Sequence, residues 1–127
     1  MKLHHLGIAC EDIAETLSKT KKLHDVQEVS EVVFDEKQQA SVQLVTLSDG
    51  TRLELIAGKI IQSLVNKKVS FYHVCYEVED IHVELEKAKK NGAFIISMPK
   101  PSALFEQRLV AFLVFPYGLV EFLEKEN

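Results

Sequence analysis

An internal repeat constrains this chain more than any other feature of its sequence. The chain has 127 residues and contains HLGIACEDI at 5–13 and HVCYEVEDI at 73–81, so each copy opens on a histidine and ends on Glu-Asp-Ile. The segments at 52–56 (RLELI) and 119–123 (LVEFL) match at nearly the same spacing. Repetition over this much of a chain is typical of a fold built from two similar supersecondary units.

Each copy predicts the same opening elements. Residues 3–10 are apolar enough for a strand, and Asp12 then offers an N-cap for a helix. In the second copy a strand is expected over 70–78, and Asp80 caps a helix that stops at 91–92, which is Asn-Gly. Strand followed by helix is therefore expected twice.

The residues after each helix favour strands separated by tight turns. In the first copy the expected strands are 26–34, 41–47 and 51–56, and in the second they are 94–97, 108–115 and 119–123. The predicted fold class is therefore α+β, with two tandem βαβββ units related by a pseudo-two-fold axis that form an open curved sheet.

One domain is expected over 1–127, made of repeat 1 (1–58), a connector (59–69) and repeat 2 (70–127). The chain is 46% hydrophobic and 27% charged, which suffices for one core. A repeat of about 60 residues would bury little surface alone. We therefore expect the two repeats to pack together or against a second chain.

Charge and hydropathy exclude several partners. The net charge is −4 and the basic residues are scattered, so no nucleic-acid partner is expected. No apolar run reaches the roughly 18 residues of a membrane span, and no signal peptide is evident, which predicts a cytoplasmic protein without a membrane partner. Cys10 and Cys75 lack Cys-x-x-Cys spacing, so neither a disulfide framework nor a thiolate zinc site is indicated.

Four ionisable side chains lie within apolar strand segments at repeated positions: His5, Glu54, His73 and Glu121. Alone, each has a plain interpretation as a solvent-facing or hydrogen-bonded strand residue. The same pair occurs twice, however, with a histidine on the first expected strand of each unit and a glutamate on the last. A pseudo-two-fold axis would bring the four together as ligands for one divalent cation, either Zn, Co, Ni, Mn or Fe.

His4 is the rival of His5 as a ligand. Adjacent strand residues face opposite sides, and the repeat aligns His4 with Tyr72 and not with a histidine. His5 is therefore the expected ligand, and His4 is expected to be structural.

These features together resemble the vicinal oxygen chelate superfamily, also called the glyoxalase/bleomycin-resistance/dioxygenase superfamily. The resemblance covers the whole chain and rests on the doubled unit and its four-ligand set. The segments 5–9, 71–78 and 118–123 look most like methylmalonyl-CoA epimerases, with glyoxalase I (lactoylglutathione lyase) next. The resemblance implies an eight-stranded open cavity and a metal-dependent isomerase or lyase.

Both activities begin by removing a proton next to a carbonyl, through a metal-stabilised enolate. The resemblance implies Glu121 as ligand and base together, and Glu54 as the natural second base. By the same resemblance, Gln43 stands where some epimerases carry the second catalytic glutamate, and an amide cannot act as a carboxylate base. One-base epimerisation, a two-base scheme with Glu54, and a different substrate with the same first step remain open.

Substrate contacts are expected from four further polar residues: Gln43, Arg52, Lys100 and Arg108. The basic ones suit a carboxylate or phosphate, as in an acyl-CoA thioester or a glutathione hemithioacetal, and surface charge is the alternative. A homodimer is implied by the resemblance. The non-enzyme alternative is an antibiotic-binding protein of the same fold, which generally lacks the four ligands.

Overall fold

The computed structural model describes residues 1–36 and 38–126 and has a mixed α+β fold. The chain forms two compact units. The first-repeat unit is His5–Tyr72, and the second-repeat unit joins Met1–His4 to the residues from His73 onward. The boundary near residue 72 lies close to the expected start of repeat 2, while a single domain over 1–127 stays a prediction.

The first-repeat unit has a strand–helix–strand order with a parallel pair at one end. Strand β1 runs parallel to β5, β5 is antiparallel to β4, and β4 is antiparallel to both β2 and β3. Strand β1 (Lys2–Ala9) belongs to this unit from His5 onward. The other elements are α1 (Ile13–Leu23), β2 (Val26–Val29), β3 (Val33–Asp35), β4 (Ala40–Leu47), β5 (Arg52–Gly58), the 3-10 turn η1 (Lys59–Ile61) and α2 (Gln62–Asn66).

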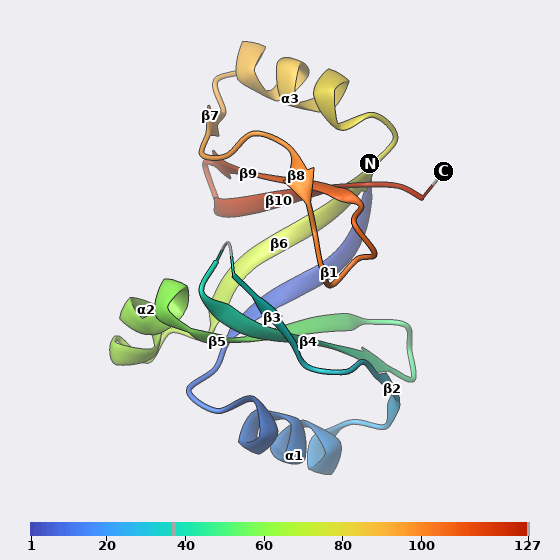
Figure 1. The fold of residues 1–127 in the computed structure, drawn as a ribbon, viewed down its shortest axis with the longest axis vertical. Coiled ribbons are helices and arrows are strands. Elements are labelled where there is room, and N and C mark those ends of the chain that lie inside the picture. Colours follow the sequence, from blue (N-terminus) through green and yellow to red (C-terminus); the bar gives the residue numbers. More distant parts are fainter. Residues whose placement is uncertain (37, 127) are drawn as a thin grey trace. The chain divides into compact units, whose positions relative to one another are not determined.

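The second-repeat unit has the same topology. Strand β6 runs parallel to β10, β10 is antiparallel to β9, and β9 is antiparallel to both β7 and β8. The elements are β6 (Phe71–Val78), α3 (Ile81–Lys90), β7 (Phe94–Ile95), β8 (Lys100–Pro101), β9 (Leu109–Phe115) and β10 (Gly118–Glu124). The predicted repetition of an α+β unit is therefore confirmed (Figure 1).

Both long helices begin at the predicted caps. The Asp12 carboxylate accepts a hydrogen bond from the Glu15 amide at 3.0 Å, and the Asp80 carboxylate accepts from the His82 and Val83 amides at 3.0 and 3.2 Å. Each cap provides an acceptor for helical amides that lack a partner within the helix. The repeated Asp therefore serves the scaffold.

Each long helix covers one face of its own strands, which we call the helix face. Ile13 of α1 packs in a cluster with Val45 and Leu55, and Ile81 of α3 packs in a cluster with Leu113 and Phe122. Since successive strand residues alternate between faces, the residues next to these core positions point to the opposite face of each unit. The polar residues singled out from the sequence are divided between these two faces.

The expected strand 26–34 is in fact two strands, β2 and β3. Between them the Ser30 hydroxyl accepts a hydrogen bond from the Leu44 amide at 2.9 Å, while the Ser30 amide still donates to the Leu44 carbonyl. A serine side chain thus replaces a backbone carbonyl in the ladder, which ends the regular pairing. Strand β8 was not expected, and the connector forms η1 and α2.

Within the described part of the chain, no helix has both the length and the apolar character that crossing a bilayer requires. The cytoplasmic location stays a prediction.

Candidate metal centre

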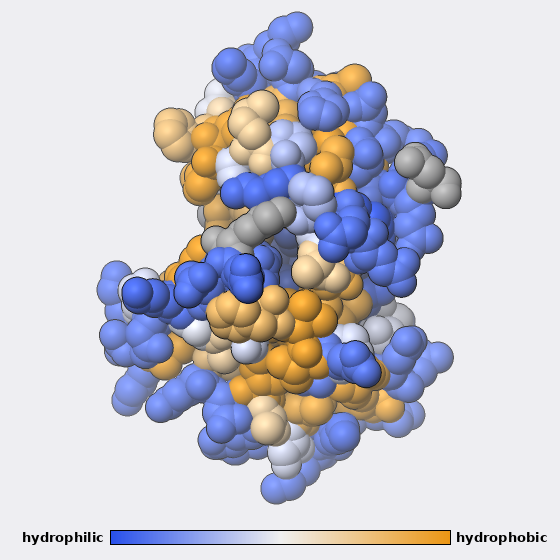
Figure 2. All heavy atoms as spheres, in the orientation of Figure 1, coloured by the Kyte–Doolittle hydropathy of each residue, from blue (hydrophilic) through white to orange (hydrophobic). Residues whose placement is uncertain are grey.

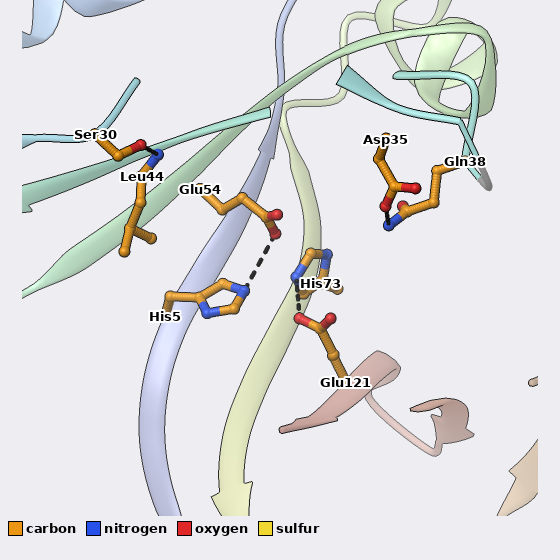
Figure 3. Close-up of polar contacts among 8 residues, drawn as sticks. All are labelled: His5, Ser30, Asp35, Gln38, Leu44, Glu54, His73 and Glu121. Carbon is orange, nitrogen blue, oxygen red and sulfur yellow. Dashed lines mark hydrogen bonds and ion pairs between the residues drawn. The ribbon is translucent and has the colours of Figure 1, made fainter. Parts of the chain in front are cut away.

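His5 and Glu54 form a buried pair in the first-repeat unit. Glu54 of β5 is the register partner of Gly7 on β1, and Gly7 lies two residues beyond His5, so both side chains point to the face opposite α1. The distance between His5 Nε2 and Glu54 Oε1 is 3.2 Å, drawn as a dashed line in Figure 3. Only 1% of His5 and 5% of Glu54 is exposed, so water competes little with this contact.

His73 and Glu121 form the equivalent pair in the second-repeat unit. Glu121 of β10 is the register partner of Cys75, again two residues beyond the histidine. His73 Nε2 lies 3.2 Å from Glu121 Oε1, and both residues are buried (Figure 3). The Phe112 ring meets the His73 imidazole edge-on, with centroids 5.4 Å apart, and limits its rotation.

The two pairs therefore follow one structural rule. A histidine on the first strand of a unit meets a glutamate on the last strand, because the parallel pairing offsets the glutamate by two residues in both units. The predicted association of His5 with Glu54 and of His73 with Glu121 is thus present within each unit.

The donor atoms of each pair suit a divalent cation. Imidazole nitrogen and carboxylate oxygen bind zinc and similar ions at about 2.0–2.2 Å. Two ligands at about 2.1 Å from one ion lie 3.2 Å apart when the angle between them is about 100°, which falls between octahedral and tetrahedral values. As a plain hydrogen bond the same distance is at the long end of the range. Each pair therefore fits one half of a metal site.

Gln43 does not share the face of Glu54. The register of β4 and β5 places Gln43 opposite Leu55 and places Leu44 opposite Glu54, and directly paired residues share a face. Gln43 is buried, and its amide Nε2 donates to the Ser30 carbonyl at 2.9 Å. Gln43 therefore holds the β2–β3 connection, and a substrate contact of Gln43 stays a prediction.

The three basic residues expected near substrate are placed differently. Arg52 is half-buried and, two residues from Glu54 on β5, shares its face. Lys100 is exposed on β8. Arg108 has internal partners: its Nη2 lies 2.7 Å from Glu77 Oε2, and its Nε donates to the Glu124 carbonyl at 2.8 Å. Arg108 therefore links the beginning of β9 to the ends of β6 and β10.

This ion pair also perturbs one carboxyl group. The hydrogen bond from Arg108, more than the charge of Arg108, lowers the pKa of Glu77 below its usual value, against a smaller opposing effect of burial. The sequence interpretation missed both this pair and Phe112. Alternation along 108–115 places Arg108 and Phe112 on one face, but their neighbours become known only with the β9–β10 register.

His4, which is expected to be structural, contacts an aromatic ring. Its imidazole meets the ring of the buried Phe105 edge-on, with centroids 5.3 Å apart. Phe105 lies in the loop before β9, so this contact ties the loop to the beginning of β1 within the second-repeat unit.

Comparison with known proteins identifies relatives of the fold. A profile described as the glyoxalase/bleomycin resistance protein/dioxygenase superfamily matches residues 4–112. No curated protein sequence matches the chain. A hypothetical protein from Bacillus halodurans C-125 is 24% identical with a TM-score of 0.78, covering 99% of this chain and 95% of that one.

Methylmalonyl-CoA epimerases are also among the similar solved structures. The enzyme from Mycobacterium tuberculosis has a TM-score of 0.83 at 15% identity, covering 99% of this chain and 89% of that one. A Glu-to-Gln variant of the enzyme from Streptomyces coelicolor, in complex with 2-nitronate-propionyl-CoA, has a TM-score of 0.81 at 18% identity, covering 100% of this chain and 99% of that one. At these identities the likeness concerns the fold.

Proposed function

Because the chain belongs to the glyoxalase/bleomycin resistance protein/dioxygenase superfamily, we propose that it is a metal-dependent enzyme that removes a proton from the carbon next to a carbonyl group. The observation that carries this proposal is the pair of buried His–Glu contacts, each 3.2 Å long and each built by the same strand register. The proposed substrate is an acyl-CoA thioester, as in a methylmalonyl-CoA epimerase.

The proposed metal ligands are the two histidines and two glutamates of these contacts: His5, Glu54, His73 and Glu121. Either pair alone supplies two protein ligands, fewer than the three or four of known zinc sites. We therefore propose that both pairs bind one ion. When bound, a divalent cation supplies a Lewis acid that polarises the carbonyl oxygen of the substrate and makes the neighbouring carbon more acidic.

Glu121 is the proposed base. Its Oε1 lies 3.2 Å from His73 Nε2. We assign the cation to Oε1 and the proton from carbon to Oε2. Burial of Glu121 strengthens the interaction of its charge with that proton, and Phe112 helps to keep His73 in place. Glu54 has the equivalent position in its own unit and is the proposed second base for returning a proton.

The test is exchange of the α-proton of methylmalonyl-CoA in D₂O with Co²⁺, Ni²⁺, Zn²⁺ or Mn²⁺ added. We expect exchange with at least one ion, and we expect Glu121→Gln to reduce it by about 10²- to 10⁴-fold because an amide cannot accept the proton. Glu79→Gln, at a side chain that is 81% exposed, is the matched control and should retain full exchange. Full exchange by Glu121→Gln would contradict the assigned role.

A second candidate reaction uses the same first step. The two glutamates occupy equivalent register positions, which suits a glyoxalase I-like isomerisation of the methylglyoxal–glutathione hemithioacetal, where a proton moves between neighbouring carbons. This substrate is tested beside methylmalonyl-CoA. A protein that binds no divalent cation and exchanges neither proton would instead support the antibiotic-binding alternative. The homodimer stays a prediction, to be checked by sedimentation.

A further inference from the structure

The residues beside Glu121 on its face of the sheet are apolar. Leu119 lies two residues before Glu121 on β10 and pairs in register with Val114 of β9, and Val114 in turn pairs with Phe94 of β7. Directly paired strand residues share a face, so these three side chains form one cross-strand row next to Glu121 and Phe112. We call Phe94, Val114 and Leu119 the apolar row.

The outer part of the apolar row is open to water. Phe94 is 71% exposed and Val114 40% exposed, whereas Leu119 is half-buried. Ile96 and Met98 follow along the same edge and are more than half exposed. Figure 2 shows hydrophobic atoms at the surface over β7 and β9. The exposure thus begins next to the buried His73–Glu121 pair and continues to the edge of the strands.

The first-repeat unit shows that the fold does not require this apolar character. There Arg52 lies two residues before Glu54 on β5 and is the register partner of Thr46 on β4. Thr46 is in turn the register partner of Glu28 on β2. The equivalent row is therefore Glu28, Thr46 and Arg52, which is polar throughout. A position that can hold an exposed glutamate in one unit holds an exposed phenylalanine in the other, so packing within the unit does not explain Phe94.

The size of the exposed surface suits a small ligand. The side chains of Phe94, Val114, Ile96 and Met98 leave roughly 400 Å² in water, which is the size of a functional patch on a monomer. A stable protein interface buries about 800 Å² on each partner, about twice as much. Continuity with the His73–Glu121 pair, together with this area, favours a substrate group over a second protein chain.

We propose that the apolar row binds an apolar acyl chain and selects thioester substrates whose acyl group is longer than that of a methylmalonyl thioester. This inference rests on the proposed function and extends it, since it names the part of the substrate that lies beside the proposed base. Burial of each methylene of such a chain strengthens binding by up to about fourfold. Phe94 and Val114 are therefore the specificity-determining residues.

The experiment compares acetyl-CoA with hexanoyl-CoA by calorimetric titration of the full chain loaded with zinc. The wild-type protein should bind hexanoyl-CoA at least about tenfold more tightly, because four further methylenes can contact the row. Phe94→Ser and Val114→Ser should reduce this ratio below about threefold. Phe34→Ser is the matched control, since Phe34 is 55% exposed on β3 in the other unit, and it should keep the wild-type ratio.

Three outcomes would overturn the inference: equal affinities in the wild type, no binding of either thioester, or a full ratio in Phe94→Ser. A Phe94→Ser protein that changes from dimer to monomer in sedimentation while keeping the ratio would show that the row is an interface. Failure of the proposed function can be distinguished from failure of this inference. Suppose that the tenfold binding ratio is found and depends on Phe94, but no substrate shows α-proton exchange. That result would contradict the proposed reaction and would still support binding of an acyl chain by the apolar row.

Discussion

The guanidinium of Arg108 lies 2.7 Å from the carboxylate of Glu77, and the corresponding positions of the first-repeat unit are both alanine. Glu77 lies four residues beyond His73, as Ala9 lies four beyond His5. Arg108 lies four residues before Phe112, which is the register partner of Glu121. In the first-repeat unit, Ala40 likewise lies four residues before Leu44, which is the register partner of Glu54. The same end of the strands thus carries an ion pair in the second-repeat unit and two alanines in the first-repeat unit.

This ion pair predicts a pH dependence of stability. Because the folded-state pKa of Glu77 is lowered, its contribution is present above the unfolded-state pKa and is lost as the pH falls through the folded-state pKa. Glu77→Gln should reduce the free energy of unfolding by about 1 kcal/mol at pH 7 and by much less near pH 3. Urea unfolding at both pH values measures the difference. Glu31→Gln, at an exposed position, should change neither value.

Metal binding should stabilise the folded protein. An ion that binds only the native state raises stability by RT ln(1 + [L]/Kd), which is about 2.7 kcal/mol when the ion is present at 100 times its Kd. We expect Zn²⁺ to raise the melting temperature of the wild-type protein, and EDTA to reverse this rise. His5→Ala and His73→Ala should abolish the rise, whereas the exposed His82→Ala should retain it. An unchanged rise in either ligand variant would contradict the assignment of that histidine.

Gly58→Ala should destabilise the first-repeat unit. Gly58 has a φ of +147°, and a Cβ atom there would lie 2.6 Å from the Gln39 carbonyl oxygen and 2.7 Å from the Ala40 Cα atom. Both contacts are with backbone, so neither can be relieved by a side-chain rotation. Strain and overpacking together should cost about 2–3 kcal/mol. Gly50→Ala is the control: its φ of +90° imposes strain, but its added Cβ meets no atom within 4 Å, and it should cost only about 1 kcal/mol.

Gln43→Leu separates a structural from a substrate-binding role. The variant removes the 2.9 Å hydrogen bond to the Ser30 carbonyl, and the loss should lower the free energy of unfolding by about 1–2 kcal/mol. Exchange of the α-proton should stay within about twofold of wild type, because Gln43 lies on the face opposite Glu54. A large loss of exchange in a fully folded Gln43→Leu protein would restore the substrate contact expected from the sequence.

The parts of the structure that depend on local chemistry were predictable from the sequence. Asp12 and Asp80 cap helices because their carboxylates reach amides two or three residues away. The pairing of His5 with Glu54 was predictable for a different reason: the repeat supplies two independent copies of one arrangement. The internal contacts of Gln43 and Arg108 were not predictable, because their partners, Ser30 and Glu77, lie 13 and 31 residues away along the chain. Such contacts depend on strand register, which alternation within a single strand does not determine.

The membership of Met1–His4 in the second-repeat unit has a consequence for the order of folding. These four residues precede the whole of His5–Tyr72, yet their compact unit is otherwise built from His73 onward. Contacts over such a sequence separation carry a larger loop-closure entropy and form late. During synthesis, the first-repeat unit can assemble from consecutive residues as they emerge, whereas the beginning of β1 must wait for its partners from His73 onward, Phe105 among them. Residues 1–4 therefore leave the ribosome before the first-repeat unit and yet reach their native contacts after it.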